Sequence, residues 1–300
     1  MKCPVCDSEK TTIEYAKLPD FEYRVDYNPD FVRCDQCGLV RQEPIPAYEE
    51  LPAFYPDDYL VYNQNFKKAS DSLFAFLKKI FYGMRARTVK SYIGTKGNVL
   101  DVGCANGKFL TSMADIGDYK LYGLDFKNTG VDFESLGIDY REGTLESIDY
   151  PENHFDAVMM DNLIEHVPDL HPFMEKLKYI VKPGGYIFGT TPNYRCPSRL
   201  IFGQYWGGFH SPRHLYLFTP DNLAQLLARY DFHNASFPIM VNAGDWAVSL
   251  QNFFRRNDKK EGKYRRAKYF ALVGILGTPT ALLTSLFGVN GSMDFVAQLK

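Results

Sequence analysis

The stretch Asn98-Val-Leu-Asp-Val-Gly-Cys-Ala-Asn-Gly-Lys-Phe-Leu110 decides the fold, because its backbone requirements change in the middle. Its first five residues are mostly β-formers, whereas from Gly107 onward the apolar side chains follow helical spacing. Gly103 and Gly107 mark the join between the two patterns. The stretch therefore predicts a strand, a glycine loop and a helix. Such a loop presents free backbone N–H groups at the carboxyl edge of a parallel sheet, where α/β proteins bind ligands.

Strand and helix patterns continue to alternate on both sides of this loop. Strands are predicted at residues 119–125, 138–141, 155–161 and 186–191, and helices at about 72–92, 131–137 and 169–181. The first helix carries an apolar face that we expect to lie against the sheet, formed by Leu73, Phe76, Leu77, Ile80, Phe81 and Met84. The alternation predicts a doubly wound, mostly parallel sheet. Residues 294–299 alternate like an antiparallel last strand.

The glycine spacing bears on the class of ligand. A dinucleotide site needs Gly-x-Gly-x-x-Gly, whereas three residues separate Gly103 from Gly107 here. The next predicted strand ends at Asp125, where a carboxylate can accept hydrogen bonds from both hydroxyls of a ribose. The pattern therefore favours a nucleoside ligand over a dinucleotide.

Several segments together resemble class I S-adenosylmethionine-dependent methyltransferases, in that family's order and spacing. They are Val99-Leu-Asp-Val-Gly-Cys-Ala-Asn-Gly107, Gly123-Leu-Asp125, Phe155-Asp-Ala-Val-Met-Met-Asp161, Ile164-Glu-His-Val167 and Lys182-Pro-Gly-Gly185. Two positions depart from the pattern: Ala105 stands where the family usually has Gly, and Thr144 stands where an acid often follows Gly143. The resemblance implies a Rossmann-like seven-stranded sheet and transfer of a methyl group to an oxygen or carbon atom. It also implies a cofactor site formed by Asp101, Gly103, Cys104, Gly107, Asp125, Phe126, Thr144, Leu145, Asp161 and Asn162.

Four of the six cysteines form two Cys-x-x-Cys pairs, Cys3 with Cys6 and Cys34 with Cys37, separated by 27 residues. Each pair can direct two thiolates at one tetrahedral ion, and four thiolates fill the coordination shell of zinc. The alternatives are disulfides or a redox pair, but we expect no secretory signal before the first pair, and two pairs exceed what redox chemistry needs. We expect a structural zinc ribbon. Cys104 and Cys196 are expected to be small buried hydrophobic residues.

The chain is accordingly divided into a zinc-ribbon module at residues 1–42, a packed linker at 43–70 and the methyltransferase domain at 71–300. The linker combines four prolines with the aromatic residues Tyr48, Phe54, Tyr55, Tyr59 and Tyr62. These aromatic side chains either roof the substrate cavity or shield the linker from solvent. The cysteine and linker segments together resemble bacterial methyltransferases with an N-terminal zinc ribbon, many of which modify sugars or cell-surface polymers. That subgroup implies a sugar or a lipid-linked acceptor.

His166 is the first candidate for proton transfer. It follows the predicted strand 155–161, and on a helix it would share a face with Asn162. The cofactor's methyl group is already activated, so the protein has to align the acceptor and remove its proton, for which a His that titrates near neutrality is suited. The alternative is a capping or buried structural His. Some members of the family bind a metal through Glu-x-x-Glu-His, but Asn162 replaces the first acid, so that metal is not expected.

The second candidate is the loop Trp206-Gly-Gly-Phe-His-Ser-Pro-Arg-His214, which lies between the predicted strand 186–191 and a helix with Thr219 as N-cap and Pro220 as first residue. His210 or His214 can be the base in place of His166. Arg213 can pair with a carboxylate or phosphate of a substrate, or it can hold the loop to a backbone carbonyl. The subgroup often shows a similar His-x-Pro-Arg-His segment.

The C-terminal region combines a basic run with an uncharged segment. Residues 255–268 hold eight Lys or Arg against two acids, although the whole chain carries a net charge of −2, and no charge occurs at 269–293. Gly, Thr, Ser and Pro279 dilute that segment, so we expect a helical insertion at about 245–290 instead of a membrane span. The insertion either touches an anionic membrane surface peripherally or covers protein. The slightly acidic chain gives no general attraction to nucleic acid, and we expect it in the cytoplasm.

Two other functions compete with methyl transfer. An NAD(P)-dependent oxidoreductase is disfavoured by the glycine spacing. A binding or assembly protein can keep the cofactor pocket without turnover, and the sequence alone does not separate it from an enzyme. The sequence gives neither the acceptor nor the oligomeric state.

Overall fold

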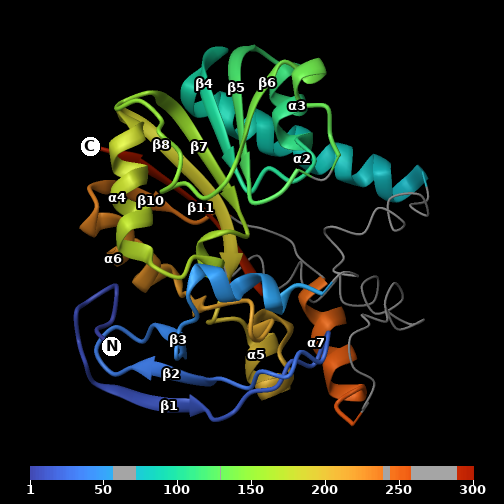
Figure 1. Ribbon diagram of the computed structural model, residues 1–300, viewed down its shortest axis with the longest axis vertical. Coiled ribbons are helices and arrows are strands. Elements are labelled where there is room, and N and C mark those ends of the chain that lie inside the picture. Colours follow the sequence, from blue (N-terminus) through green and yellow to red (C-terminus); the bar gives the residue numbers. More distant parts are fainter. Residues whose placement is uncertain (57–71, 129, 239–243, 258–288) are drawn as a thin grey trace.

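The computed structural model describes residues 1–56, 72–128, 130–238, 244–257 and 289–300, and the side chains of the helix that begins at Ser72 from Lys79 onward. The described chain forms two lobes, each built on a sheet (Figure 1). The larger lobe holds seven strands and the smaller lobe four. The C-terminus lies in the larger lobe and the N-terminus in the smaller one.

The larger sheet has the strand order β10-β11-β8-β7-β4-β5-β6. All its neighbouring strands are parallel except β11, which runs antiparallel to both β8 and β10. The predicted mostly parallel seven-stranded sheet is therefore confirmed, together with its antiparallel last strand. The strands are β4 (Lys96–Val102), β5 (Asp118–Asp125), β6 (Ile138–Glu142), β7 (Phe155–Asp161), β8 (Val181–Pro192), β10 (Phe232–Ser236) and β11 (Ser292–Leu299).

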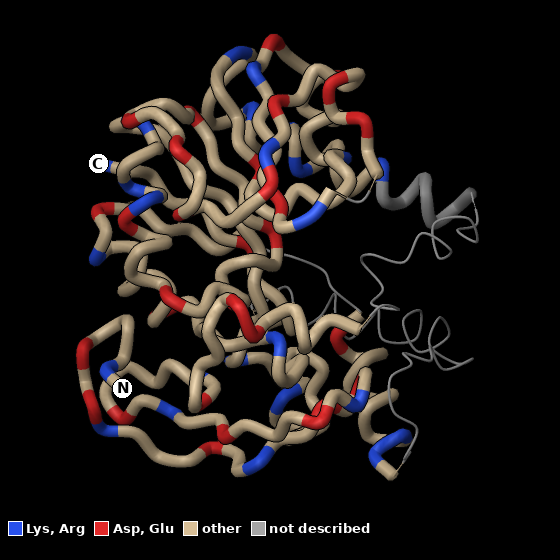
Figure 2. The backbone as a smooth tube through the Cα atoms, viewed as in Figure 1, with Lys and Arg blue, Asp and Glu red and all other residues tan. Residues whose placement is uncertain are grey.

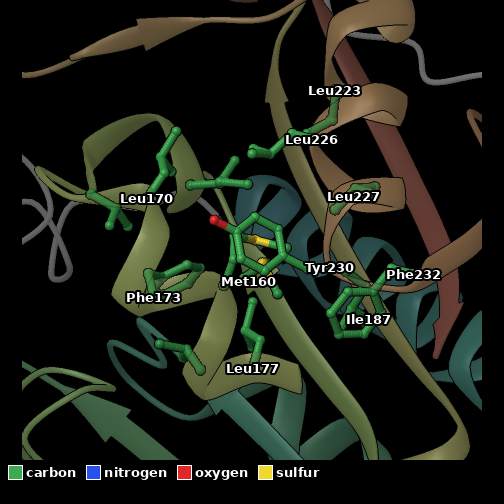
Figure 3. Close-up of a cluster of buried hydrophobic side chains, with 14 of the residues drawn as sticks. Met160, Leu170, Phe173, Leu177, Ile187, Leu223, Leu226, Leu227, Tyr230 and Phe232 are labelled. Carbon is green, nitrogen blue, oxygen red and sulfur yellow. The ribbon is translucent and has the colours of Figure 1, made fainter. Parts of the chain in front are cut away.

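Helices cover both faces of this sheet, and side chains on successive strand residues point to opposite faces. On β7, Val158 and Met160 pack with α4 (Leu170–Ile180) and α6 (Pro220–Arg229), whose apolar side chains appear in Figure 3. Ala157 and Met159 face the other way, toward α2 (Ser72–Ile93) and α3 (Lys108–Ala114). Burial on two faces explains why β7 is an almost continuous apolar run.

The helix boundaries follow capping signals in the sequence. Asp169 accepts a hydrogen bond from the backbone N–H of His171 at the start of α4. Thr219 caps α6 and Pro220 is its first residue, as predicted. Gly137, with φ 69°, ends the predicted crossover helix, but only Glu134–Leu136 (η2) is helical there, as a 3-10 turn. The crossover is too short for a longer helix.

The apolar face predicted for the first helix is wrong in its described part. Ile80, Phe81 and Met84 are 43%, 40% and 60% exposed. The helix instead buries Ala86 and Val89 against the sheet. Helical spacing identifies which residues share a face, but not which of two apolar stripes meets the sheet.

The smaller sheet has the order β1-β2-β3-β9 and is antiparallel throughout. Its strands are β1 (Thr11–Tyr15), β2 (Asp30–Cys34), β3 (Val40–Glu43) and β9 (Tyr216–Leu217). Because β9 follows the histidine loop (residues 206–214), the N-terminal segment (residues 1–56) and that loop share one sheet. Sequence patterns do not predict this pairing, because β9 is only two residues long.

Short helices fill the space beside the smaller sheet. They are η1 (Tyr48–Phe54), α5 (Pro197–Phe202), η4 (Gly203–Tyr205), η5 (Gly207–Phe209) and α7 (Gly244–Phe254). Trp206 and Phe209 of the histidine loop pack there with Phe31 and Leu217 in a separate apolar cluster. Cys196 is fully buried in this cluster and Cys104 is buried in the larger lobe, as predicted for both.

Basic and acidic residues are interspersed over both lobes (Figure 2). The basic run from 258 and the uncharged segment to 288 lie outside the described residues, so the predictions of an insertion and of membrane contact there stay predictions. Along the ranges that the structure describes, no helix has both the length and the apolar character needed to cross a membrane.

Leu177 gives a test of the packing between α4 and the sheet, because its side chain is fully buried there. We expect Leu177→Ala to lower the free energy of unfolding by roughly 2–5 kcal/mol, since it leaves a cavity. Leu200→Ala is the control, because Leu200 is 71% exposed on α5. Denaturant unfolding measures both. Equal effects of the two substitutions would contradict the packing described here.

Candidate functional site

A cleft opens at the carboxyl ends of β4 and β5, as expected for a parallel sheet of this kind. The turn after β6, the short 3-10 helix η3 (Ile164–His166) and the linker helix η1 close its other sides. Fourteen residues line the cleft: Tyr48, Val102, Gly103, Leu124, Asp125, Phe126, Gly143, Thr144, Leu145, Glu146, Leu163, His166, Val167 and Phe173.

Gly103 makes the turn from β4 into the cleft with φ 81°. A side chain is strained at that angle, and a Cβ atom would meet Leu163 Cδ1 at 3.4 Å. The N–H groups of Gly103 and Cys104 both donate to the carbonyl of Leu124, at 2.7 and 3.1 Å. These bonds fix the loop against β5 and leave the cleft wall bare of side chains at this point.

Asp125 ends β5 at the cleft, as the sequence predicted. Its Oδ2 accepts a hydrogen bond of 2.8 Å from the backbone N–H of Ala105, which joins the strand end to the glycine loop. Burial raises the pKa of Asp125, while the N–H groups of Ala105, Lys127 and Phe126 act in the opposite direction. The carboxylate is thus oriented by backbone and still borders the cleft.

Tyr48 and Glu146 form a polar contact at the rim that the sequence patterns did not assign. The Tyr48 hydroxyl donates to Glu146 Oε1 at 2.8 Å, whereas Glu146 Oε2 is buried and has no partner in the described part of the chain. A buried carboxylate oxygen without a donor is costly, so it is a ready acceptor for a ligand N–H. Glu146 follows Thr144 by two residues, close to where the resembling family often has its acid.

Half of the predicted cofactor residues line the cleft: Gly103, Asp125, Phe126, Thr144 and Leu145. The other five lie nearby in other roles. The Cys104 thiol points into the core beneath Gly123, and Gly107, with φ 66°, is the N-cap of α3. Asn162, with φ 50°, is exposed in the turn after β7, so it shares no helical face with His166. That predicted helix is wrong, because only Ile164–His166 is helical and as a 3-10 turn.

Asp101 and Asp161 form an acidic layer below the cleft. Asp101 is buried, and its pKa is raised well above the ordinary value by burial and by the charges of Asp161 and Asp125. Arg85 of α2 pairs with Asp161, and its other nitrogen lies 3.0 Å from Asp294 of β11. The arginine therefore balances acids from two strands. The sequence patterns missed it, since its partners are 76 and 209 residues away.

His166 lies at the cleft with its tautomer fixed by its partner. Its Nδ1 is 2.9 Å from the carbonyl oxygen of Arg213 and 3.2 Å from the hydroxyl of Tyr55. A carbonyl oxygen can only accept, so Nδ1 carries the proton and Nε2 carries the lone pair. Tyr55 and Tyr48 both come from the linker, whose aromatic residues therefore reach the cleft and the histidine beside it.

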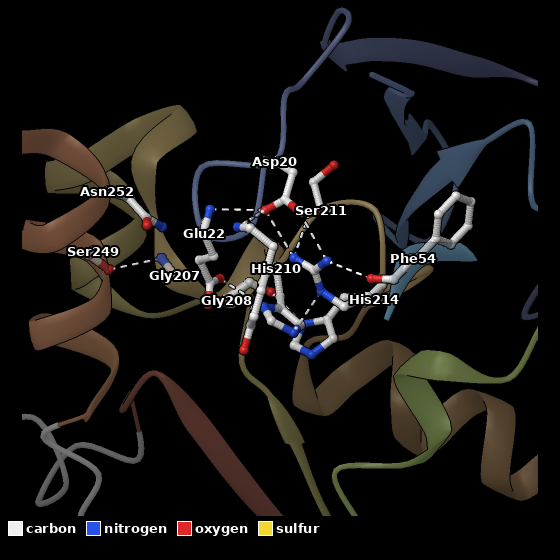
Figure 4. Close-up of polar contacts among 12 residues, drawn as sticks. Asp20, Glu22, Phe54, Gly207, Gly208, His210, Ser211, His214, Ser249 and Asn252 are labelled. Carbon is white, nitrogen blue, oxygen red and sulfur yellow. Dashed lines mark hydrogen bonds and ion pairs between the residues drawn. The ribbon is translucent and has the colours of Figure 1, made fainter. Parts of the chain in front are cut away.

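The two histidines of the loop also have tautomers set by their hydrogen-bond partners. His214 Nδ1 lies 2.8 Å from the carbonyl of Gly208, so its Nε2 also carries a lone pair. His210 Nε2 accepts a hydrogen bond from Arg213 Nε at 3.0 Å, so its Nδ1 carries the proton and faces Glu22 at 2.7 Å. Figure 4 shows His210 and His214 side by side, and the rings of His166 and His214 meet edge to face at 4.6 Å.

The structure corrects the expectation that His166 titrates near neutrality. Burial lowers the pKa of His166 to about 3, and burial together with the neighbouring histidines lowers the pKa of His214 well below its ordinary value. Desolvation disfavours the charged imidazolium. Both rings are therefore neutral at pH 7 in the unliganded protein and present proton-accepting nitrogens.

Arg213 is fully buried, and its guanidinium pairs with Asp20 of the N-terminal segment at 2.9 and 3.0 Å. This geometry matches the second of its two expected roles, holding the loop. It places the charge away from the cleft, whose lining does not include Arg213.

Two groups of side chains have the composition of a metal site. The thiol sulfur atoms of Cys3, Cys6, Cys34 and Cys37 all lie within 4.8 Å of one another, and none is in a disulfide. Each pair sits in a tight turn, with Asp7 N–H donating to Cys3 and Gly38 N–H donating to Cys34. Four converging thiols fit a tetrahedral ion.

The second group is Glu165, His166 and His214, with ligand atoms again within 4.8 Å. Glu165 is fully buried, with Thr191 nearby and no well-formed hydrogen bond to either carboxylate oxygen among the described residues. Burial raises the pKa of Glu165 to about 8. His214 thus adds a third possible ligand beside Glu165 and His166, although it lies 48 residues after His166 in the chain.

The chain is similar in sequence to known methyltransferases over more than half of its length. A family model described as a methyltransferase domain matches residues 68–236. A ubiquinone biosynthesis O-methyltransferase of Chelativorans sp. is 31% identical over 159 residues, which is 49% of this chain and 62% of that protein. The mitochondrial enzyme of the same name from Dictyostelium discoideum is 30% identical over 43% of this chain and 50% of that protein. The chain thus spans less than two thirds of either relative.

One solved structure resembles nearly the whole chain. It is the 1,6-didemethyltoxoflavin-N1-methyltransferase of Burkholderia thailandensis, with its substrate and S-adenosylhomocysteine bound. The TM-score is 0.53 at 13% identity, and the match covers 93% of this chain and 99% of that one. At this identity the likeness shows the fold alone.

The depressed pKa of His166 predicts a dependence of stability on pH. Below the unfolded pKa of about 6.5 the unfolded chain binds a proton that the folded chain does not, so stability falls as the pH drops toward 3. We expect His166→Gln to reduce this slope by up to about 1.4 kcal/mol per pH unit. Denaturant unfolding at pH 7, 6 and 5 measures it. An unchanged slope would show that His166 already binds its proton in the folded state.

Proposed function

Because the chain belongs to the methyltransferase-domain family, we propose that it transfers the methyl group of S-adenosylmethionine to a hydroxyl oxygen of a small-molecule acceptor. The observation that carries the proposal is one cleft lined by Asp125, Gly103 and His166, in which the Nδ1 bond of His166 to the carbonyl of Arg213 leaves the lone pair on Nε2. Both relatives named above are O-methyltransferases, which favours oxygen over carbon. The sugar or lipid-linked acceptor stays a prediction from the subgroup resemblance.

The cofactor side of the cleft is formed by backbone and acids. Asp125 is placed to accept hydrogen bonds from the ribose hydroxyls, and the unpartnered Oε2 of Glu146 to accept one from the amino group of adenine. Gly103 leaves room for the methionine moiety. When bound, the cofactor supplies a methyl group on a positively charged sulfur. These residues fit that ligand, which carries two ribose hydroxyls, an adenine amino group and a methionine moiety.

The acceptor side has to receive one proton. A bond forms between the acceptor oxygen and the methyl carbon as the sulfur–carbon bond breaks, and the hydroxyl proton leaves. A neutral imidazole in the lining of the cleft can take that proton on its free nitrogen, as Nε2 of His166 does in this proposal. His214 lies against His166, and Glu165 lies 3.9 Å from His214 Nε2.

The cofactor assignment is tested by Asp125→Ala. We expect this substitution to weaken binding of S-adenosylhomocysteine more than about ten-fold, because two charge-assisted hydrogen bonds are lost. Isothermal titration calorimetry measures the affinity, and NAD serves as the competing ligand. Asp139→Ala is the matched control, since Asp139 lies on neighbouring β6 but is 47% exposed. Tight binding of NAD, or an unchanged affinity of the Asp125 variant for S-adenosylhomocysteine, would contradict the cofactor assignment.

The four clustered cysteines support a structural zinc site in the N-terminal segment. A closed set of four thiolates has no position for water, so the ion's contribution is to folding. Cys3 and Cys6 precede β1, while Cys34 ends β2 and Cys37 lies in the turn before β3, so one ion would tie the N-terminus to the β2–β3 hairpin. Zinc here stabilises the sheet that β9 completes.

Elemental analysis of purified protein tests the metal content. We expect near-stoichiometric zinc in the wild-type protein and its loss, with reduced stability, in Cys34→Ser. Glu165→Gln is the control, because it removes a ligand from the second group and leaves the thiols intact. Wild-type protein without zinc would refute the ribbon. A second equivalent of metal that disappears only in Glu165→Gln would place a cation beside His166.

A further inference from the structure

A buried ion pair joins the N-terminal segment to the histidine loop. Arg213 is 0% and Asp20 is 1% exposed, and the two groups pair through two hydrogen bonds. The backbone N–H groups of Glu22, Tyr23 and Val25 also donate to the Asp20 carboxylate. Burial alone would raise the pKa of Asp20, but Arg213 and these donors hold it below its ordinary value.

Arg213 has an acceptor for each of its five N–H groups. Two bonds go to Asp20, one to the carbonyl of Phe54, one to the carbonyl of Ser211 and one to His210 Nε2. The guanidinium also lies over the ring of Tyr23, 4.7 Å from its centroid. Figure 4 shows Asp20, Phe54, Ser211 and His210 gathered around this point. A guanidinium with all donors satisfied in a planar fork has one allowed position.

The backbone of the same arginine holds the histidine at the cleft. The carbonyl oxygen of Arg213 accepts the hydrogen bond from His166 Nδ1, which fixes the ring and leaves Nε2 deprotonated. A second hydrogen bond also joins the histidine loop to the N-terminal segment: the Ser211 hydroxyl donates to the carbonyl of Leu18 at 3.1 Å. The path from Asp20 to His166 therefore consists of one ion pair, one residue and one hydrogen bond.

We propose that Asp20 is a positioning residue for methyl transfer, which fixes the tautomer and orientation of His166 through Arg213. The inference rests on the proposed function, in which His166 receives the proton. Asp20 touches neither the cleft nor the cofactor side, so its effect should be separable from cofactor binding. In this proposal the N-terminal segment stabilises the fold and also contributes to the reaction, through the position of His166.

The tautomer of His166 can be read without an acceptor. The chain has only six histidines, so long-range ¹H–¹⁵N correlation spectra of protein labelled in histidine resolve their ring nitrogens, and His166→Gln assigns the signal. In the wild-type protein we expect a single form with the proton on Nδ1. In Asp20→Asn, one guanidinium N–H meets an amide N–H, Arg213 shifts, and we expect His166 to populate both tautomers while S-adenosylhomocysteine still binds.

Asp7→Asn is the matched control. Asp7 is also an N-terminal acid paired with an arginine of the larger lobe, Arg229 at 2.8 Å, but this pair is exposed on the surface. We expect it to leave the His166 signals unchanged. A folded Asp20→Asn protein with the wild-type His166 signals would overturn the proposal.

Asp20→Glu covers the case in which the asparagine variant does not fold. It keeps the charge and moves the carboxylate by one methylene, and it too should perturb the His166 tautomer; unchanged signals there overturn the proposal equally. If wild-type protein fails to bind S-adenosylhomocysteine, the proposed function is wrong, but the coupling of Asp20 to His166 is still decided by the spectra.

Discussion

The geometry of the site depends on the buried ion pair between Arg213 and Asp20. Removing a guanidinium and a carboxylate from water costs several kcal/mol each, and only complete hydrogen bonding makes such a pair tolerable. Here every donor of the guanidinium has an acceptor, and the acceptors come from β-sheet loops, the linker and the histidine loop. Segments that are 193 and 159 residues apart are thereby held in one arrangement.

The two sides of the cleft are built by different means. The cofactor side is local in sequence: a strand end, a glycine turn and the acid at the end of the next strand, all positioned by the parallel sheet. The other side is assembled from distant parts, because η1 brings Tyr48, the linker brings Tyr55 and the histidine loop brings His214. In this chain the cofactor side therefore follows from neighbouring strands, whereas the acceptor side depends on contacts between distant segments.

The same division explains what the sequence could predict. The mostly parallel sheet with its antiparallel last strand, the turn at Gly103, Asp125 at the cleft and the cap at Thr219 were predicted from sequence patterns. Glu146, Asp20 and the pairing of β3 with β9 depend on tertiary contacts and left no local signal. The expectation that His166 titrates near neutrality was wrong for a related reason. The ordinary pKa is that of a solvated imidazole, whereas the folded chain buries the ring. The exposed apolar residues of α2 show a further limit: helical spacing of apolar residues does not tell which face of a helix packs against the sheet.

A crystal structure of the complex with S-adenosylhomocysteine tests the account most directly. We expect the ribose hydroxyls within hydrogen-bonding distance of the Asp125 carboxylate, the adenine amino group at Glu146 Oε2, and the sulfur on the side of the cleft that His166 lines. A nucleoside bound elsewhere, or His166 sealed from the ligand by the linker, would contradict it.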